Sequence, residues 1–352
     1  MKILNQEISS RFACYHGDTC EAIKSIPDST IDYIVFSPPF ESLYTYSASD
    51  RDMGNSAVSA QFHVHYAYLV SEMLRILKPG RLLSFHCMNM PTSKARDGYI
   101  GLRDFRGEMI RKKIEAGFIY HSEVAIWKDP VTAMQRTKAL GLLYKQLRKD
   151  AAMSRQGIPD YLVTMRKPGV NPDPVRHYQQ GEEGAKEAQM FPVDLWQEYA
   201  SPIYGEEIPC DVWTPGLMVH RPSWQSIADN FPDPVWMDIN PSDTLQYRSA
   251  REHNDERHVC PLQLEVIRRG VKLWTNPNDI VFSPFGGIGS EPYVAIQEGR
   301  RGIACELKES YYKQMVGNCR NAANNQQGEL FAPDAIQRSL TEVLRPSEPC
   351  PV

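Results

Sequence analysis

The stretch Asp279-Ile-Val-Phe-Ser-Pro-Phe-Gly-Gly-Ile-Gly-Ser290 places a short apolar run directly before a glycine-rich turn. The run at 279–283 predicts a short buried strand, and a helical pattern follows the turn. Glycines between a strand and a helix let the backbone approach a ligand closely, and the helix amino terminus adds free N–H donors. Glu306 follows Gly289 by 17 residues, an offset typical of an acid that accepts from ribose hydroxyls. The stretch therefore predicts an α/β fold with a nucleoside-cofactor site; a glycine turn with an unrelated glutamate is the alternative.

A second turn, Ser37-Pro38-Pro39-Phe40, ends the apolar run Ile31 to Phe36. Two successive prolines donate no backbone hydrogen bonds and hold φ near about −65°. The turn is therefore expected to be rigid, with carbonyl groups pointing away from the strand end. Such carbonyls can accept hydrogen bonds from an amino group while the ring of Phe40 stacks on the planar system that carries it. For these four residues alone, a strand-ending turn beside an unrelated phenylalanine is the alternative.

Outward from these turns, apolar runs alternate with helical patterns. We expect helices at about 62–77, 104–116 and 262–273, and strands at about 81–86, 118–127 and 302–306. Lys78-Pro79-Gly80 is expected to end the first helix. Such alternation implies βαβ units and a mainly parallel sheet.

The chain changes character twice. Between 129 and 250 prolines become frequent and hydrophobic periodicity weakens, which predicts an inserted, loop-rich region. Beyond 321 the chain is polar, as is typical of a mobile tail. The sequence therefore predicts two core parts, 1–128 and 251–320, separated by an insertion at 129–250 and followed by the tail 321–352.

Composition excludes several classes of protein. Apolar residues make up 42% and charged residues 23% of the 352 residues, so wholesale disorder is excluded. A net charge of −4 excludes a globally basic nucleic-acid coat protein but leaves room for a local basic patch. The first residues lack the apolar core of a signal peptide, and no run approaches the ~18 apolar residues of a membrane span. The eight cysteines form no CxxC pair, so we expect reduced thiols, no metal, no membrane and a cytoplasmic location.

Taken together, the two turns resemble the signatures of the β-class DNA amino-methyltransferases. These enzymes transfer a methyl group from S-adenosyl-L-methionine to the exocyclic nitrogen of cytosine or adenine. Ser37–Phe40 matches their catalytic signature (D/N/S)-P-P-(Y/F), and Ser283–Ser290 matches their cofactor signature D-P-F-x-G-x-G-(T/S). The catalytic motif also precedes the cofactor motif, as in this class. The resemblance covers about 10–128 and 255–315.

This resemblance implies a Rossmann-like, doubly wound α/β methyltransferase fold with circularly permuted halves. Residues 1–128 would form the catalytic half, 129–250 the target-recognition region and 251–320 the cofactor half. The strands that carry the two turns are expected to be neighbours, because ligands of such sheets bind where the strand order reverses.

The resemblance also implies roles for individual residues. The catalytic residues would be Ser37, Pro38, Pro39 and Phe40. The cofactor would be bound by Asp18, His258, Pro284, Phe285, Gly287, Gly289, Ser290 and Glu306. The chain departs from the family pattern at Ser283, where aspartate is usual, and after His258, where valine replaces proline.

By the same resemblance, the target base leaves the duplex, at a cost of a few kcal/mol. Phe40 would stack on it, while the Pro38 carbonyl and the Ser37 hydroxyl accept from its amino group. No metal and no covalent intermediate are required. Family members with S-P-P-(Y/F) mostly modify cytosine N4, so cytosine is favoured and adenine N6 is the alternative.

Other chemistries fit less well. Cytosine C5 methylation needs a cysteine nucleophile after proline, but Pro209-Cys210 is followed by Asp211. Protein-glutamine and several RNA methyltransferases place the glycine motif first. His86-Cys87 lacks partners at metal-ligand spacing, so it is interpreted as an ordinary core or surface pair. A DNA-binding module without catalysis remains the alternative from another class.

Double-stranded DNA is the expected macromolecular partner, and a restriction endonuclease and the sliding clamp are further candidates. Double-stranded DNA is indicated by a basic segment with one acidic residue, Asp150. Its basic residues are Arg136, Lys138, Lys145, Arg148, Lys149 and Arg155. A restriction endonuclease would be a separate protein. Gln327–Phe331 resembles the Q-x-x-L-F peptide that binds the bacterial sliding clamp, but only three positions match, and a plain disordered tail is the favoured interpretation.

Overall fold

The computed structural model describes residues 3–40, 59–128, 148–153, 157–176, 178–179, 188–189, 235–236, 238–246 and 261–326. The chain divides into two compact units. Unit 1 comprises Met1–Ser122, Leu162–Val175 and Asn240–Val352, and unit 2 comprises Glu123–Tyr161 and Arg176–Ile239.

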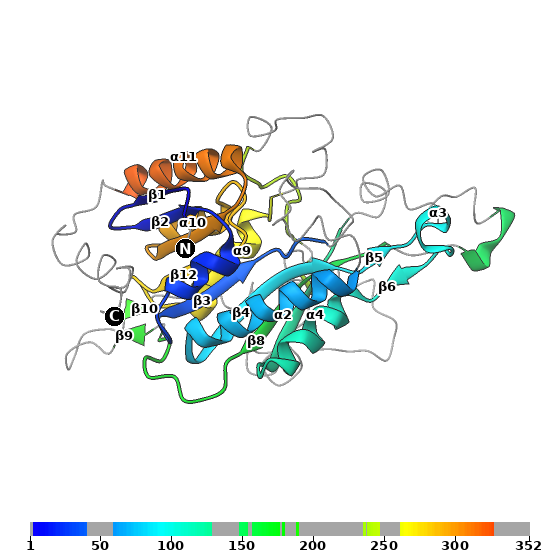
Figure 1. The fold of residues 1–352 in the computed structure, drawn as a ribbon, viewed down its shortest axis with the longest axis horizontal. Coiled ribbons are helices and arrows are strands. Elements are labelled where there is room, and N and C mark those ends of the chain that lie inside the picture. Colours follow the sequence, from blue (N-terminus) through cyan, green and yellow to red (C-terminus); the bar gives the residue numbers. More distant parts are fainter. Residues whose placement is uncertain are drawn as a thin grey trace, which may run out of the picture. The chain divides into compact units, whose positions relative to one another are not determined.

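The sheet of unit 1 has the strand order β1-β2-β13-β12-β3-β4-β8 (Figure 1). Its strands are β1 (Asn5–Ile8), β2 (Phe12–His16), β3 (Ile31–Phe36), β4 (Leu77–Met88), β8 (Asp160–Arg166), β12 (Ile280–Ser283) and β13 (Arg301–Glu306). Strands β2, β13, β12, β3 and β4 pair in parallel, whereas β1 is antiparallel to β2. The predicted α/β fold with a mainly parallel sheet is confirmed.

Helices cover both faces of this sheet. They are α1 (Thr19–Ala22) with the 3₁₀ turn η1 (Ile23–Ser25), α2 (Ser59–Ile76), α4 (Phe105–Glu115), α9 (Leu264–Trp274), α10 (Ser290–Gln297) and α11 (Glu309–Gln326). The short helix α3 (Lys94–Asp97) lies apart from this sheet (Figure 1). On β3, the ring of Tyr33 contacts that of Trp274 in α9. The centroid of the Phe36 ring lies 5.8 Å from Nζ of Lys113 in α4. Residues separated by an odd number of positions on a strand point to opposite faces. Helices α9 and α4 therefore lie on opposite sides, as the doubly wound prediction requires.

The long helix α11 is held by an apolar stripe. Tyr312, Met315 and Cys319 are buried against Phe12 and Cys14 of β2. Their spacing of three and four residues puts them on one face of the helix. Because α11 runs to Gln326, it extends six residues into the segment predicted to be a mobile tail, and Ala322 there is buried. The start of that prediction is therefore wrong, and residues 327–352 lie outside the described part of the chain.

Two further predicted boundaries differ from the structure. Helix α2 ends at Ile76 and β4 begins at Leu77, so the expected Lys78-Pro79-Gly80 terminator lies inside a strand. The pairing of β3 with β4 shifts register there, and Gly80 adopts a φ of +70°. Strand β8 falls within the predicted insertion 129–250 but lies beside β4 in the sheet. Strand β8 is buried on both faces, so its apolar residues do not alternate with polar ones, and the sequence pattern did not predict a strand there.

Unit 2 is described only in short pieces. The last residues of β7 (Ile119–Ile126) pair in parallel with β11 (Val235–Trp236), and Trp236 is buried. Strands β9 (Tyr178–Gln179) and β10 (Ala188–Gln189) pair antiparallel. A 3₁₀ turn, η5, spans Ala151–Met153, and Lys128 forms an ion pair with Asp160.

In unit 1, the two-residue strands β5 (Met90–Pro91) and β6 (Leu102–Arg103) form a separate antiparallel pair.

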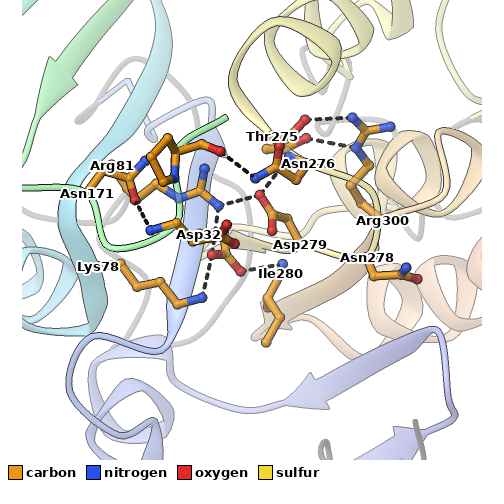
Figure 2. A network of polar contacts seen from close by, with 12 residues as sticks. Asp32, Lys78, Arg81, Asn171, Thr275, Asn276, Asn278, Asp279, Ile280 and Arg300 are labelled. Atoms are coloured by element: carbon orange, nitrogen blue, oxygen red, sulfur yellow. Dashed lines mark hydrogen bonds and ion pairs between the residues drawn. The ribbon is translucent and has the colours of Figure 1, made fainter. Parts of the chain in front are cut away.

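A buried charge network holds together the amino ends of β3, β4 and β12 (Figure 2). Arg81 donates to Asp32 at 2.8 Å and forms an ion pair with Asp279. Asp32 also accepts from Lys78 at 2.6 Å and from the backbone N–H of Ile280 at 2.9 Å. The network lies at the opposite end of these strands from the two turns that the sequence singled out.

Candidate active site

The turn Ser37–Phe40 follows β3 at its carboxyl end. Ser37 and Phe40 are half-buried, and the two prolines between them are buried. The ring of Phe40 lies 5.6 Å from that of Phe105, centroid to centroid. Phe105 is fully buried at the start of α4, so Phe40 packs against a ring that is itself fixed in the core.

The glycine turn follows β12, the strand directly beside β3. Val281 pairs with Tyr33, and Phe282 with Ile34. The carboxyl ends of the two strands therefore lie at one edge of the sheet, as predicted. The rings of Phe36 and Phe285 are 5.8 Å apart, so the two turns begin in contact.

The glycines of this turn meet real conformational demands. Gly289 has a φ of +91° and caps α10. A Cβ at Gly289 would lie 2.9 Å from Met315 Cγ, whereas a Cβ at Gly287, whose φ is +52°, would meet no atom of the described residues within 4 Å. One glycine thus allows close packing on α11, and the other borders open space.

Glu306 ties the turn to the next strand. Its Oε2 accepts from the backbone N–H of Gly287 at 2.7 Å, and its Oε1 accepts from that of Lys308 at 2.8 Å. A carboxylate oxygen can accept more than one hydrogen bond. The carboxylate is therefore fixed beside the open space at Gly287, where it can also accept from a ligand hydroxyl.

The segment around Asp18 joins the same assembly. Asp18 accepts from the N–H of Cys20 at 2.9 Å and so caps α1. The N–H of Gly17 donates to the carbonyl of Glu306 at 2.9 Å, and the Thr19 hydroxyl donates to the carbonyl of Pro284. The sequence had placed Asp18 in the cofactor site, and the structure brings it next to the glycine turn.

Several predicted site residues cannot be located. His258, Arg136, Lys138, Lys145 and Arg155 lie outside the described residues, as does Gln327–Phe331. Arg148 and Lys149 are described and exposed. Ser283, which replaces the usual aspartate, is buried, and its hydroxyl has no hydrogen-bond partner among the described residues.

Two residues of the site were missed by sequence reasoning. His86 had been interpreted as an ordinary core or surface histidine, but the pairing of Phe36 with Phe85 sets it beside Ser37. Glu291 had no assigned role, because an acid in the first helical turn normally complements the helix dipole in solvent. It is in fact buried in α10, and this burial raises its pKa to about 8, with a further contribution from Glu306.

Glu291 predicts an unusual pH dependence of stability. Its folded pKa of about 8 exceeds the usual 4.5, so between these values the folded state binds more protons than the unfolded state. The free energy of unfolding therefore falls as pH rises through this window. We expect Glu291→Gln to reduce this loss of unfolding free energy by a few kcal/mol, since a pKa shift of one unit corresponds to about 1.4 kcal/mol. Denaturant unfolding at pH 5 and pH 8.5 measures this.

The control is Glu309→Gln. Glu309 is exposed and pairs with Lys313 at 2.7 Å. This variant should keep the wild-type pH dependence, and an equal flattening in both variants would show that Glu291 is not its source.

Among the described residues, no group of three His, Cys, Asp or Glu side chains is arranged to hold a metal ion. No helix in the described ranges is both long and apolar enough to cross a membrane.

The fold and the two turns define a class: doubly wound α/β proteins in which a glycine turn and a Ser-Pro-Pro-Phe turn lie at one edge of the sheet. Residues 31–317 match the DNA methylase family N6_N4_Mtase, and the chain belongs to that family. This confirms the resemblance drawn from the sequence.

Individual relatives agree with this assignment. The type II methyltransferase M.BamHI of Bacillus amyloliquefaciens is 23% identical over 305 residues, which are 87% of this chain and 54% of M.BamHI. M.BglII of Bacillus subtilis is 35% identical over 74 residues, which are 20% of this chain and 21% of M.BglII. The chain thus spans about half the length of M.BamHI.

Solved structures share the fold. PvuII DNA methyltransferase (cytosine-N4-specific) aligns with a TM-score of 0.56 and 14% identity, covering 97% of this chain and 96% of its own. TTHA0409 from Thermus thermophilus, solved with S-adenosyl-L-methionine, aligns with a TM-score of 0.55 and 18% identity, covering 90% and 95%.

Proposed function

We propose that the chain is an S-adenosyl-L-methionine-dependent DNA methyltransferase that modifies the exocyclic amino group of a flipped base, N4 of cytosine by preference. The observation that carries the proposal is the pairing of β3 with β12, which sets Ser37–Phe40 and the glycine turn at one sheet edge. A methyl donor bound at the glycine turn would then meet the amino group of a base bound at Ser37–Phe40.

The residues around the glycine turn fit the nucleoside part of this cofactor. Open space borders Gly287, and Glu306 is held beside it by two backbone N–H groups. We assign Glu306 to the ribose hydroxyls, from which a carboxylate fixed in this position can accept. The bound cofactor supplies an electrophilic methyl group.

The residues of the other turn orient the base. Phe40 stacks on it, backed by Phe105, and the Pro38 carbonyl and Ser37 hydroxyl accept from its amino group. Acceptors that hold these protons free the nitrogen lone pair for attack. Positioning of two reactants in this way can supply about 7–11 kcal/mol of the barrier.

Cytosine is preferred because of Ser37. A serine hydroxyl is a weaker acceptor than the aspartate usual in adenine-N6 members of the family, and adenine remains the alternative. The PvuII enzyme is named as cytosine-N4-specific, which describes that protein.

Contacts to DNA are assigned to the basic residues between 136 and 155, within the segment 129–250 that we propose as the recognition region. Arg148 and Lys149 are exposed, as phosphate contacts must be. Their neutralisation should lower the salt dependence of DNA binding; an unchanged salt slope in Arg148→Gln/Lys149→Gln would contradict the assignment. The names of the type II relatives suggest pairing with a separate endonuclease.

Mass spectrometry of nucleosides tests the proposed function. Unmethylated DNA incubated with the protein and S-adenosyl-L-methionine should yield N4-methylcytosine. Phe40→Ala should lower the rate about 10–100-fold, because stacking of a base on an aromatic ring is worth about 1–3 kcal/mol. Tyr68→Ala, which removes an exposed ring of α2, is the control and should retain the wild-type rate.

Each other outcome has a definite meaning. N6-methyladenine would keep the mechanism and replace cytosine with adenine. Cofactor binding without any methylated DNA base would refute DNA as the substrate. Loss of both would leave a DNA-binding module without catalysis.

A further inference from the structure

We propose that His86 is the proton acceptor of the reaction and acts through the hydroxyl of Ser37. This inference rests on the proposed amino-methylation and adds a residue that the family signature does not contain. It assigns a destination to the proton that the amine must release.

The geometry places the two side chains in contact. Ser37 Oγ lies 3.2 Å from His86 Nδ1 and 3.2 Å from the His86 backbone carbonyl, to which it can donate. The first distance is within the reach of about 2.6–3.2 Å expected of a general base. The hydroxyl proton can therefore turn from the carbonyl to the ring nitrogen. Acceptance at Nδ1 requires the tautomer with its proton on Nε2.

The sheet holds this arrangement. Phe36 and Phe85 pair in register across β3 and β4, so the next residues on each strand, Ser37 and His86, stand side by side. His86 is 9% exposed, which limits competition from water for its ring nitrogen. The paired backbones of β3 and β4 therefore fix the positions of both Ser37 and His86.

The chemistry balances. The amine nitrogen forms a bond to the methyl carbon as the carbon–sulfur bond breaks, and that bond's electron pair stays on sulfur. The methylated nitrogen then carries one proton too many. Ser37 takes this proton as it passes its own to His86 Nδ1, which leaves a neutral secondary amine and a histidinium. The Pro38 carbonyl can accept a hydrogen bond, but it is too weak a base to take the proton.

Other titratable groups lie nearby, and their effect on a pH profile must be distinguished from that of His86. Cys87 points to the opposite face of β4, because successive side chains alternate. Lys113 of α4 lies on that opposite face, 3.5 Å from the centroid of the Phe85 ring, and burial lowers its pKa to about 7. On the face of β4 that carries His86, β8 contributes the uncharged hydroxyl of Thr164, which bonds to Ser84 at 2.9 Å. A wild-type pH profile alone could therefore report Lys113, and the assignment needs a variant.

The decisive variant is His86→Asn. Asparagine places an amide near the position of Nδ1, so it can still bond to Ser37, but it takes no proton. We expect the single-turnover methylation rate of the wild type to fall as pH is lowered, because a protonated imidazole cannot accept the proton. In His86→Asn the rate should be about 100-fold lower, the fall should vanish, and cofactor affinity should be unchanged.

The control is His121→Asn, the same substitution at an exposed histidine whose Nδ1 bonds to Ser122 at 2.8 Å. It should keep the wild-type rate and profile. A Ser37→Ala/His86→Asn double variant should be no slower than the slower single variant, because the two residues act as one unit.

Three results would overturn the inference. A wild-type rate that is independent of pH would do so without any variant. A His86→Asn protein with the wild-type rate and profile would show that the histidine at most positions Ser37. A fall at low pH that persists in His86→Asn would assign the titration to another group. If the wild type methylates no DNA, the proposed function itself fails and this inference with it.

Discussion

Asp32→Ala is expected to lower the free energy of unfolding by about 3–5 kcal/mol, the usual cost of removing one partner of a buried ion pair. Arg81 is 2% exposed and would lose one of the two carboxylates that neutralise it, Asp279 being the other. The substitution would also remove the acceptor of Lys78 and of the Ile280 N–H. Three neighbouring strands would thus lose a common anchor.

The matched control is Asp28→Ala. Asp28 pairs with Arg75 at 2.6 Å, but its side chain is 77% exposed, so its loss should cost less than about 1 kcal/mol. Urea unfolding of both variants measures the difference. Equal losses would mean that the buried network contributes no more than a surface pair.

Gly289→Ala is expected to destabilise the protein by about 2–5 kcal/mol and to abolish cofactor binding. A φ of +91° costs an L-residue about 1–2 kcal/mol, and overpacking adds about 1–3 kcal/mol. The new methyl group would lie 2.9 Å from Met315 Cγ and 3.1 Å from Met315 Cα. Because backbone atoms of α11 cannot rotate away as a side chain can, the glycine turn must shift, which disturbs the hydrogen bond between the Gly287 N–H and Glu306.

Gly299→Ala separates strain from position. Gly299 has a φ of +76°, and a Cβ there would meet no atom within 4 Å in the part of the chain that the structure describes. The Gly299→Ala variant should lose only the about 1–2 kcal/mol that a positive φ costs an L-residue. It should bind S-adenosyl-L-methionine normally in a calorimetric titration. Normal cofactor binding by a folded Gly289→Ala protein would contradict the proposed role of the turn.

The parts of the site that could be predicted lie in consecutive residues. Proline and glycine act on their own backbone, so Ser37–Phe40 and the turn after Ser283 were legible without a structure. The helices α2, α4 and α9 and the strands β3, β7, β12 and β13 were also predicted to within a few residues, because their apolar periodicity is local. Strands β1 and β2 and the long helix α11 were not predicted. The neighbouring placement of β3 and β12 was predicted from the fold that the family resemblance implies, and the structure confirms it.

The parts that could not be predicted depend on residues far apart in the chain. Strand β8 was taken as part of an insertion because its burial on both faces removes the alternating pattern. Glu291 was overlooked because an acid at a helix start is usually exposed, and only the packing around α10 buries it. The end of α2 was predicted to within one residue, but β4 starts four residues earlier than predicted, because the register shift between β3 and β4 accommodates Lys78-Pro79-Gly80 inside the strand.

The sequence by itself therefore determined the class of the protein: the fold, the family and the two turns, since these follow from local backbone chemistry and from motif order. Tertiary structure alone decided what surrounds the turns. Ser37 and His86 are 49 residues apart, as are Asp32 and Arg81. Only the register of β3 against β4 brings each pair together, because strand pairing depends on the packing of the whole sheet rather than on neighbours in sequence.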